Sequence, residues 1–249
     1  MTTLLCVENL TTKIQGQILH DRVSLDIKSG EIVGLVGGSG SGKSVFLRVL
    51  LGLMPYESGQ LTFLQPDGTP LKDRRQIGVM FQSGALFSSQ TVGENIETPL
   101  REVMGLTPPL IHELARLKIS MVGLPPEAYD KYPAELSGGM IKRAAVARAM
   151  ALEGPLLFLD EPTAGLDPIS AEGMDRLLKD LRDSLGLSVL MVTHDLDSLH
   201  ALCDRVAVLV DKKLVTGTLE ELHQHSHPWI QAYFSGPRGR ALHKQQGKS

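Results

Sequence analysis

The segment Gly37–Ser44 has the residue types and the spacing of a phosphate-binding loop. It consists of Gly37, Gly38, Ser39, Gly40, Ser41, Gly42, Lys43 and Ser44 and satisfies the pattern G-x-x-x-x-G-K-[ST]. Glycines let backbone N–H groups close around phosphate oxygens, and a helix that begins after the loop adds a partial positive charge. We expect Lys43 to reach the β- and γ-phosphates of a nucleotide and the Ser44 hydroxyl to bind Mg²⁺. Residue frequencies produce this pattern by chance in roughly one chain in a hundred, so we predict nucleotide binding.

A second segment supplies two adjacent carboxylates. The apolar run Leu156–Leu159 is followed directly by Asp160 and Glu161. A buried strand that ends in this way places both carboxylates at the C-terminal edge of a parallel sheet, where α/β proteins bind ligands. Asp160 could hold Mg²⁺ through water, and Glu161 could orient or deprotonate the water that attacks a phosphate. An isolated Asp-Glu pair is more often a solvated turn, but beside a phosphate loop it indicates a P-loop NTPase.

Three further polar segments are ambiguous when each is taken alone. Gln82 follows a short strand pattern, and His194 follows the strand pattern Val189–Val192. A lone Gln or His at a strand end is usually only a polar surface residue. A loop-like stretch at the start of a long helical pattern consists of Leu136, Ser137, Gly138, Gly139 and Met140. The N–H groups of that helix could bind a second phosphate, which would make sense if it served a different nucleotide.

The elements that must position these residues alternate between strand and helix. Ile32–Val36 is a continuous apolar run, typical of a strand buried on both faces of a parallel sheet. Helical spacing follows at 44–53 and again over 91–152, where we expect breaks at Pro99, Pro108, Pro125 and Pro133. The last third predicts Leu156–Leu159, Ala171–Leu185, Val189–Val192, Leu196–Leu202 and Val206–Val210 as alternating strands and helices. This βαβ order implies a parallel sheet with a helical insertion.

Composition limits the possible partners. The net charge of −3 disfavours nucleic acid, because nucleic-acid binding usually needs a concentrated basic surface. The two cysteines, Cys6 and Cys203, offer no disulfide framework. We see no signal peptide at the N-terminus, and the apolar runs are far shorter than the roughly 20 residues that a bilayer span requires. Any contact with a membrane should therefore come through partners.

Together and in this order, the motifs resemble the nucleotide-binding domain of the ABC transporter family over residues 4–235. The resemblance implies an α/β fold of the ABC-type P-loop NTPase kind. Such a fold has a RecA-like parallel-sheet core, an antiparallel β portion at the N-terminus and an inserted helical subdomain, here at about 88–153. We expect residues 1–235 to form this domain and residues 236–249 to be a basic, mobile tail. Trp229, Tyr233 and Phe234 would either pack the last helix onto the body or contact a partner subunit.

The resemblance also implies a function for each motif in ATP hydrolysis. ATP would bind to the phosphate loop and to Gln82 of the Q-loop, and Mg²⁺ to Ser44, Gln82 and Asp160. Glu161 would be the catalytic carboxylate, His194 the switch histidine and Asp167 part of the D-loop. Two copies of the chain would meet head to tail, so that the signature Leu136–Met140 of each closes on the ATP of the other. Hydrolysis would then open the dimer and drive the transport step.

Two stretches point to a subtype. Gln82–Ile96 and Met140–Arg143 resemble the Mla-type ATPases of Gram-negative bacteria, which power phospholipid trafficking between the inner and outer membranes. This likeness implies a peripheral subunit on the cytoplasmic face of the inner membrane. Its partners would be an integral membrane permease, an Mce-domain protein and a small accessory subunit. Two positions depart from the common pattern, since Ile14 stands where family members often stack an aromatic ring on adenine, and Met140 stands where many have Gln.

Three other functions compete with this interpretation. The first is the ATPase of an importer for amino acids or other small solutes. The second is a soluble ABC ATPase of DNA repair or translation, but such proteins usually carry long coiled coils or two fused cassettes, and this sequence has neither. The third is a small-molecule kinase, which would lack the stretch Leu136–Met140.

Overall fold

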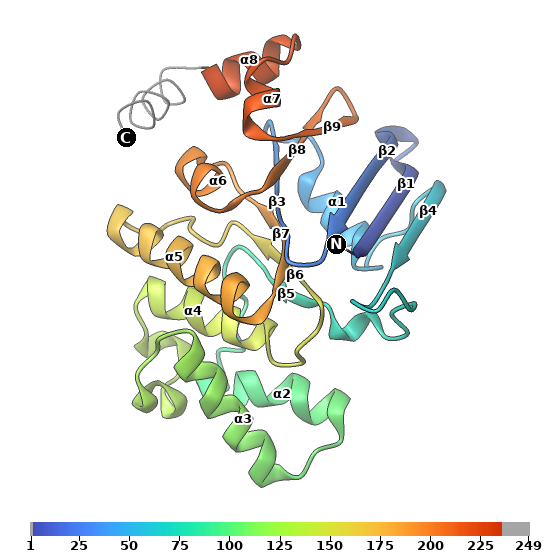
Figure 1. Ribbon diagram of the computed structural model, residues 1–249. Coiled ribbons are helices and arrows are strands. Elements are labelled where there is room, and N and C mark those ends of the chain that lie inside the picture. Colours follow the sequence, from blue (N-terminus) through green and yellow to red (C-terminus); the bar gives the residue numbers. More distant parts are fainter. Residues whose placement is uncertain (1, 236–249) are drawn as a thin grey trace. The chain divides into compact units, whose positions relative to one another are not determined.

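The computed structural model describes residues 2–235, and these fall into two compact units (Figure 1). The first unit contains residues 2–70 and 192–235, and the second contains residues 71–191. None of the helices in the described part of the chain has the length and apolar character to cross a bilayer.

The first unit contains an antiparallel sheet with the strand order β2-β1-β4. Its strands are β1 (Thr3–Ile14), β2 (Gln17–Lys28) and β4 (Ser58–Phe63). The two-residue turn Gln15-Gly16 joins β1 to β2, and both residues have positive φ, of 49° and 78°. Turns with this backbone twist match the twist of antiparallel strands. The expected antiparallel portion at the N-terminus is confirmed.

The first unit also contains β3 (Ile32–Gly37), which pairs in parallel with β8 (Arg205–Val210). The apolar run Ile32–Val36 is fully buried, as a strand covered on both faces should be. β9 (Lys213–Gly217) extends β8 as an antiparallel hairpin. Helix α6 (Leu196–Leu202) lies close to β3 at Gly34, where an added Cβ would stand only 2.5 Å from Leu199 Cδ2.

The helices α1 (Lys43–Leu50), α7 (Leu219–His223) and α8 (Pro228–Ser235) complete the first unit. Helix α1 ends three residues earlier than the pattern over 44–53 predicts, because the chain turns at Leu51–Leu53. Phe234 of α8 is completely buried in an apolar cluster with residues that include Val36, Val208 and Ile230. Packing of the last described helix onto the body is therefore confirmed.

The second unit combines a small parallel sheet with most of the helical residues. Its strands are β5 (Gly78–Met80), β6 (Leu156–Asp160) and β7 (Ser188–Val192), in the order β5-β6-β7. Its α-helices are α2 (Val92–Met104), α3 (Pro108–Met121), α4 (Gly138–Ala149) and α5 (Pro168–Leu185). Short 3₁₀ turns occupy Arg74–Gln76 (η1), Pro126–Asp130 (η2) and Pro133–Glu135 (η3). Strands β5 and β6 are parallel, so the parallel pairing that the βαβ order predicts is found here and between β3 and β8.

One predicted helix break is wrong. Pro99 lies inside α2, although its ring removes one helical hydrogen bond. The turn before it is reinforced by the hydroxyl of Thr98, which donates to the carbonyl oxygen of Glu94 at 2.8 Å. A capping box between Thr91 and Glu94 fixes the start of the helix, and Val92, Ile96 and Leu100 bury its apolar face. Burial of each such side chain stabilises the fold by about 1.5–3 kcal/mol, and together the three offset the roughly 3 kcal/mol cost of the proline.

Truncation of Phe234 tests how α8 is held. We expect Phe234→Ala to lower the free energy of unfolding by about 3–5 kcal/mol, because a fully buried ring is lost and a cavity remains. Ser235→Ala, at an exposed position of the same helix, is the control and should leave stability within about 0.5 kcal/mol of the parent. Urea denaturation of the three proteins measures both values. Equal stabilities would mean that α8 does not depend on this packing.

Candidate nucleotide site

The phosphate loop lies in the first unit between the end of β3 and the start of α1. Gly42 is the N-cap of α1 and has φ of 105°, a left-handed conformation that favours glycine. Because the N-cap is a glycine, no side-chain hydrogen bond caps this helix. Ser39, Gly40 and Ser44 are exposed. The helix end can therefore accept an anion from outside.

Lys43 folds back over the loop that precedes it. Its Nζ donates to the carbonyl oxygens of Gly37 at 2.7 Å and Gly38 at 3.1 Å. These contacts hold the ammonium at the phosphate loop, within reach of a phosphate group that binds there. The geometry fits the function that the sequence predicts for Lys43.

A buried histidine supports the phosphate loop. His20 of β2 is inaccessible to solvent, and its Nε2 lies 3.2 Å from the carbonyl oxygen of Gly42. Its ring stacks edge-on against Phe46 of α1, with 5.5 Å between the ring centroids. An added Cβ on Gly42 would stand 2.7 Å from His20 Nε2, so glycine is also required here for space. Burial lowers the pKa of His20 from 6.5, because the charged imidazolium is poorly solvated.

Two aromatic residues of α8 lie close to predicted site residues of the first unit. Trp229 and Tyr233 stack with 5.0 Å between ring centroids. The indole Nε1 of Trp229 would lie 3.7 Å from a Cβ on Gly38, and the Tyr233 hydroxyl donates to the carbonyl oxygen of His194 at 3.2 Å. The helix thus lies close to the phosphate loop and contacts the main chain of the predicted switch histidine. The His194 side chain is exposed.

The second unit holds the other predicted site residues. Asp160 is the last residue of β6, and Glu161 follows it with φ of 53°. This left-handed conformation costs a non-glycine residue about 1–2 kcal/mol. The carbonyl oxygen of Glu161 accepts a hydrogen bond of 2.9 Å from the buried ammonium of Lys142. A bond to a charged donor contributes about 1.5–3 kcal/mol, which is enough to offset the strain.

Gln82 follows β5 and has an exposed side chain. Its carbonyl oxygen accepts a second bond from Lys142 Nζ, at 2.5 Å. The structure therefore brings the backbone of Gln82 and that of Glu161 to one lysine of α4. Burial lowers the pKa of Lys142, although the nearby charges of Glu161 and Asp160 act in the opposite direction.

The predicted signature forms the start of α4. Ser137 is the N-cap, and its hydroxyl accepts a hydrogen bond from the Met140 N–H at 3.3 Å. Ser137 and Gly138 are exposed. The expectation that this stretch opens a helix is confirmed.

Asp167 caps α5 in the same unit. Its carboxylate accepts from the N–H groups of Ile169 and Ser170, both at 3.1 Å, and from the Ser170 hydroxyl at 2.6 Å. The Ser170 hydroxyl is the main reason that the pKa of Asp167 is lowered, and the backbone bonds add to it. Asp167 therefore stays ionised and holds the first turn of α5 in place.

Residues 87–95 form an ordered surface next to Gln82. The buried side chain of Asn95 accepts from the Phe87 N–H at 2.7 Å and donates to the carbonyl oxygens of Phe87, Gln90 and Thr91. Phe87 itself is 52% exposed. The Asn95 side chain thus fixes the loop that leads into α2, and this loop exposes the Phe87 ring to solvent.

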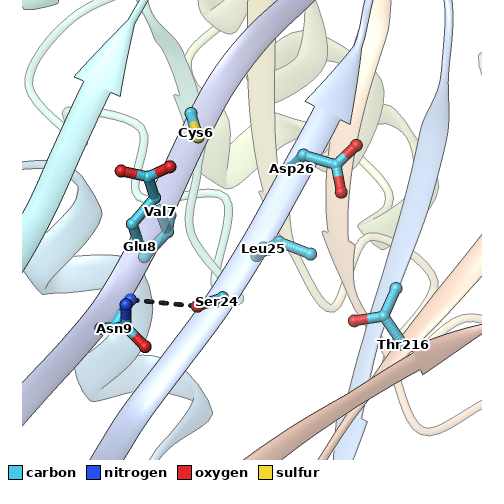
Figure 2. A pocket seen from close by; sticks show the side chains of 8 residues that line it. All are labelled: Cys6, Val7, Glu8, Asn9, Ser24, Leu25, Asp26 and Thr216. Atoms are coloured by element: carbon cyan, nitrogen blue, oxygen red, sulfur yellow. Dashed lines mark hydrogen bonds between the residues drawn. The ribbon is translucent and has the colours of Figure 1, made fainter.

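A pocket of about 490 Å³ in the first unit lies apart from all of these residues (Figure 2). It is lined by Cys6, Val7, Glu8, Asn9, Ser24, Leu25, Asp26 and Thr216. Burial together with Glu8 and Asp26 raises the pKa of the Cys6 thiol, which makes it a poor nucleophile. None of the predicted site residues lines this pocket, and we assign it no part in nucleotide chemistry.

Sequence reasoning assigned three of these residues no part in the site. His20, Lys142 and Tyr233 act through main-chain carbonyl groups that are distant in the sequence, and no local pattern signals such contacts. The alternating pattern of β2 predicts only that its inward positions are buried. Ile14, at the predicted adenine position, is half-buried at the end of β1.

Comparison with known proteins identifies the family. A family model described as ABC transporter matches residues 20–164. The chain is 35% identical over 240 residues to the intermembrane phospholipid transport system ATP-binding protein MlaF of Haemophilus influenzae, covering 94% of this chain and 90% of that protein. It is also 35% identical over 242 residues to the probable ribonucleotide transport ATP-binding protein mkl of Mycobacterium leprae, covering 93% of this chain and 69% of that protein.

Solved structures agree with this result. The dimeric post-hydrolysis structure of the ATP-binding cassette MJ0796 with ADP and Pi matches with a TM-score of 0.74 and 30% identity, covering 86% of this chain and 98% of that one. The chain belongs to the ABC transporter family. It is an ATP-binding and ATP-hydrolysing subunit, and the predicted fold class is confirmed.

The buried imidazole of His20 gives a pH prediction. Because its pKa is lowered in the folded chain, the unfolded chain binds this proton more readily, and the free energy of unfolding should fall as pH drops below about 6.5. His20→Gln keeps an N–H donor for the Gly42 carbonyl group but cannot titrate. We expect the variant to match the parent at pH 8 and to lose less stability by pH 5.5. Chemical denaturation at both pH values measures this, and equal losses would exclude His20 as a source of acid sensitivity.

Proposed function

We propose that this chain is the ATPase subunit of a transporter that moves phospholipid between the inner and outer membranes of a Gram-negative bacterium. The observation that carries this proposal is the likeness to MlaF, which extends over nearly the whole of both chains. The likeness to mkl is equal in identity but leaves about a third of that protein unmatched. Phospholipid is therefore favoured over ribonucleotide as the cargo.

The first unit supplies phosphate binding in this proposal. The N–H groups of the phosphate loop and of the first turn of α1 bind the phosphate oxygens, and Lys43 exchanges its carbonyl partners for the β- and γ-phosphates. His20 and Gly42 keep the loop open beneath the ligand. His194, whose main chain is held by Tyr233, contacts the γ-phosphate with its exposed side chain.

The second unit supplies the attack on the γ-phosphate. Glu161 orients the attacking water and accepts its proton. Ser44, Gln82 and Asp160 carry oxygen donors of the kind that Mg²⁺ prefers, and these residues would hold the ion. The ion would supply positive charge to neutralise the phosphate oxygens.

The assembly in this proposal is a head-to-tail dimer on a permease. Ser137, Gly138 and Gly139 open a helix that can bind a second phosphate, and in the dimer that phosphate belongs to the opposite subunit's ATP. Asp167 lies in the D-loop of the same interface. The exposed surface around Phe87 receives the permease, and an Mce-domain protein with a small accessory subunit completes the complex at the cytoplasmic face of the inner membrane.

Two substitutions separate binding from hydrolysis. Lys43→Ala removes the charge that holds the phosphates, so ATP affinity and turnover should both fall. Glu161→Gln keeps the shape of the side chain but loses the base, so ATP should still bind while the hydrolysis rate falls about 10²–10⁴-fold. Equilibrium ATP binding and steady-state phosphate release are measured on both variants. A near-normal rate for Glu161→Gln would mean that the catalytic carboxylate is assigned wrongly.

The cargo is tested by purification from native membranes. We expect the subunit to copurify with a multi-spanning permease, an Mce-domain protein and bound phospholipid. Cells that carry Lys43→Ala should have an outer membrane permeable to detergent, because misplaced phospholipid disturbs its outer surface. Copurification with a periplasmic solute-binding protein, together with an intact outer membrane in the mutant, would contradict the lipid assignment but not the ATPase assignment.

A further inference from the structure

Lys142 is a buried lysine whose ammonium group donates hydrogen bonds to main-chain carbonyl oxygens. It lies in α4, is only 6% exposed, and donates from Nζ to the carbonyl oxygens of Gln82 at 2.5 Å and Glu161 at 2.9 Å. A buried ammonium is costly unless its donors are satisfied, so its position is fixed by these partners. Both bonds use main-chain oxygens. They therefore fix the backbone positions of Gln82 and Glu161 without hydrogen bonding to the side chains of these residues.

The two bonded segments leave neighbouring strands at the same end. Strands β5 and β6 are parallel and in register, with Met80 opposite Leu159. Gln82 follows β5 and Glu161 follows β6, so both segments begin at one edge of the sheet. Lys142 therefore joins the two segments just beyond the strands that carry them.

Both segments contain main chain that needs external support. Glu161 has φ of 53° and Ala85 has φ of 46°, conformations that non-glycine residues rarely adopt. Arg148 of α4 donates to the carbonyl oxygens of Ala85 at 2.6 Å and Gly84 at 3.0 Å. Helix α4 thus holds the segment after β5 at two points, and through Lys142 it also holds Glu161.

We propose that Lys142 is a positioning residue for ATP hydrolysis. It sets the backbone from which Glu161 and Gln82 project, and it makes that geometry depend on the placement of α4. The same helix begins at Ser137, the residue that would face the opposite subunit's nucleotide. Occupation of one site is thereby transmitted along α4 to the Glu161 of the other site. This inference rests on the proposed function of Glu161 and of the signature.

Substitutions of Lys142 within the intact transporter complex test the inference. Lys142→Met keeps much of the side-chain length but removes every donor, and we expect kcat to fall about 10- to 100-fold, since small misplacements of reacting groups have costs of this size. KM and the equilibrium affinity for ATP should stay within about threefold, because the phosphate loop is untouched. Lys142→Arg retains donors for both carbonyl groups and should recover most of kcat.

A matched control comes from another buried lysine of the same unit. Lys118 is 3% exposed and pairs with Glu153 at 2.7 Å, and neither residue is among the predicted site residues. Lys118→Met should leave kcat near the parent value. If Lys142→Met loses its fold in a thermal melt, Lys142→Leu, which also lacks a donor, is measured in its place against the same expectations.

The outcomes separate this inference from the function on which it rests. A kcat for the Lys142 variant equal to that of Lys118→Met would overturn the inference, and so would an arginine variant as slow as the methionine variant. Glu161→Gln is measured in the same series. If Glu161→Gln is inactive while Lys142→Met is fully active, only the positioning by Lys142 is wrong. If Glu161→Gln is active, the assignment of the catalytic carboxylate is wrong.

Discussion

The phosphate loop has no room for a side chain at Gly37 or at Gly42, and the shape of the loop depends on this exclusion. A Cβ on Gly37 would stand 2.6 Å from the carbonyl oxygen of Leu209, and one on Gly42 would stand 2.7 Å from His20 Nε2. The backbone is therefore pressed against β8 on one side and against β2 on the other. With these two sides packed, the backbone N–H groups of the loop are the groups that can bind a phosphate. The sheet and the helices of the first unit hold this arrangement in place.

Charged side chains hold the main chain of the predicted site segments in the second unit, whereas close packing around glycines holds the phosphate loop in the first. Its functional segments contain left-handed residues that are not glycine, and cations from α4 hold their carbonyl groups. Close packing of glycine gives a loop with one shape. A charge-assisted bond from a single helix gives a segment that can shift when the helix shifts. The contrast agrees with the proposal that phosphate binding stays constant while the geometry around Glu161 changes with the position of α4.

Most elements could be predicted because their signals are local. The apolar runs of β3, β6, β7 and β8 and the glycines before α1 each lie within a few residues of what they specify. Pro99 misled the prediction because tertiary burial of α2 outweighs a local cost. The bond from Lys142 to Gln82 spans 60 positions and that from Tyr233 to His194 spans 39, so neither leaves a local pattern. The spacing of the motif residues makes them predictable, whereas the residues that hold them act through contacts that exist only in the folded chain.

Trp229, in the last described helix of the first unit, lies close to Gly38 of the phosphate loop, which comes far earlier in the chain. On the ribosome, the phosphate loop emerges long before α8 has been made. At about 5–20 residues per second, the interval is roughly 10–40 s. During that time β3 lacks the apolar cover of Phe234 and β8. The nascent chain therefore exposes a hydrophobic strand during synthesis, the kind of surface that makes incomplete chains prone to aggregate.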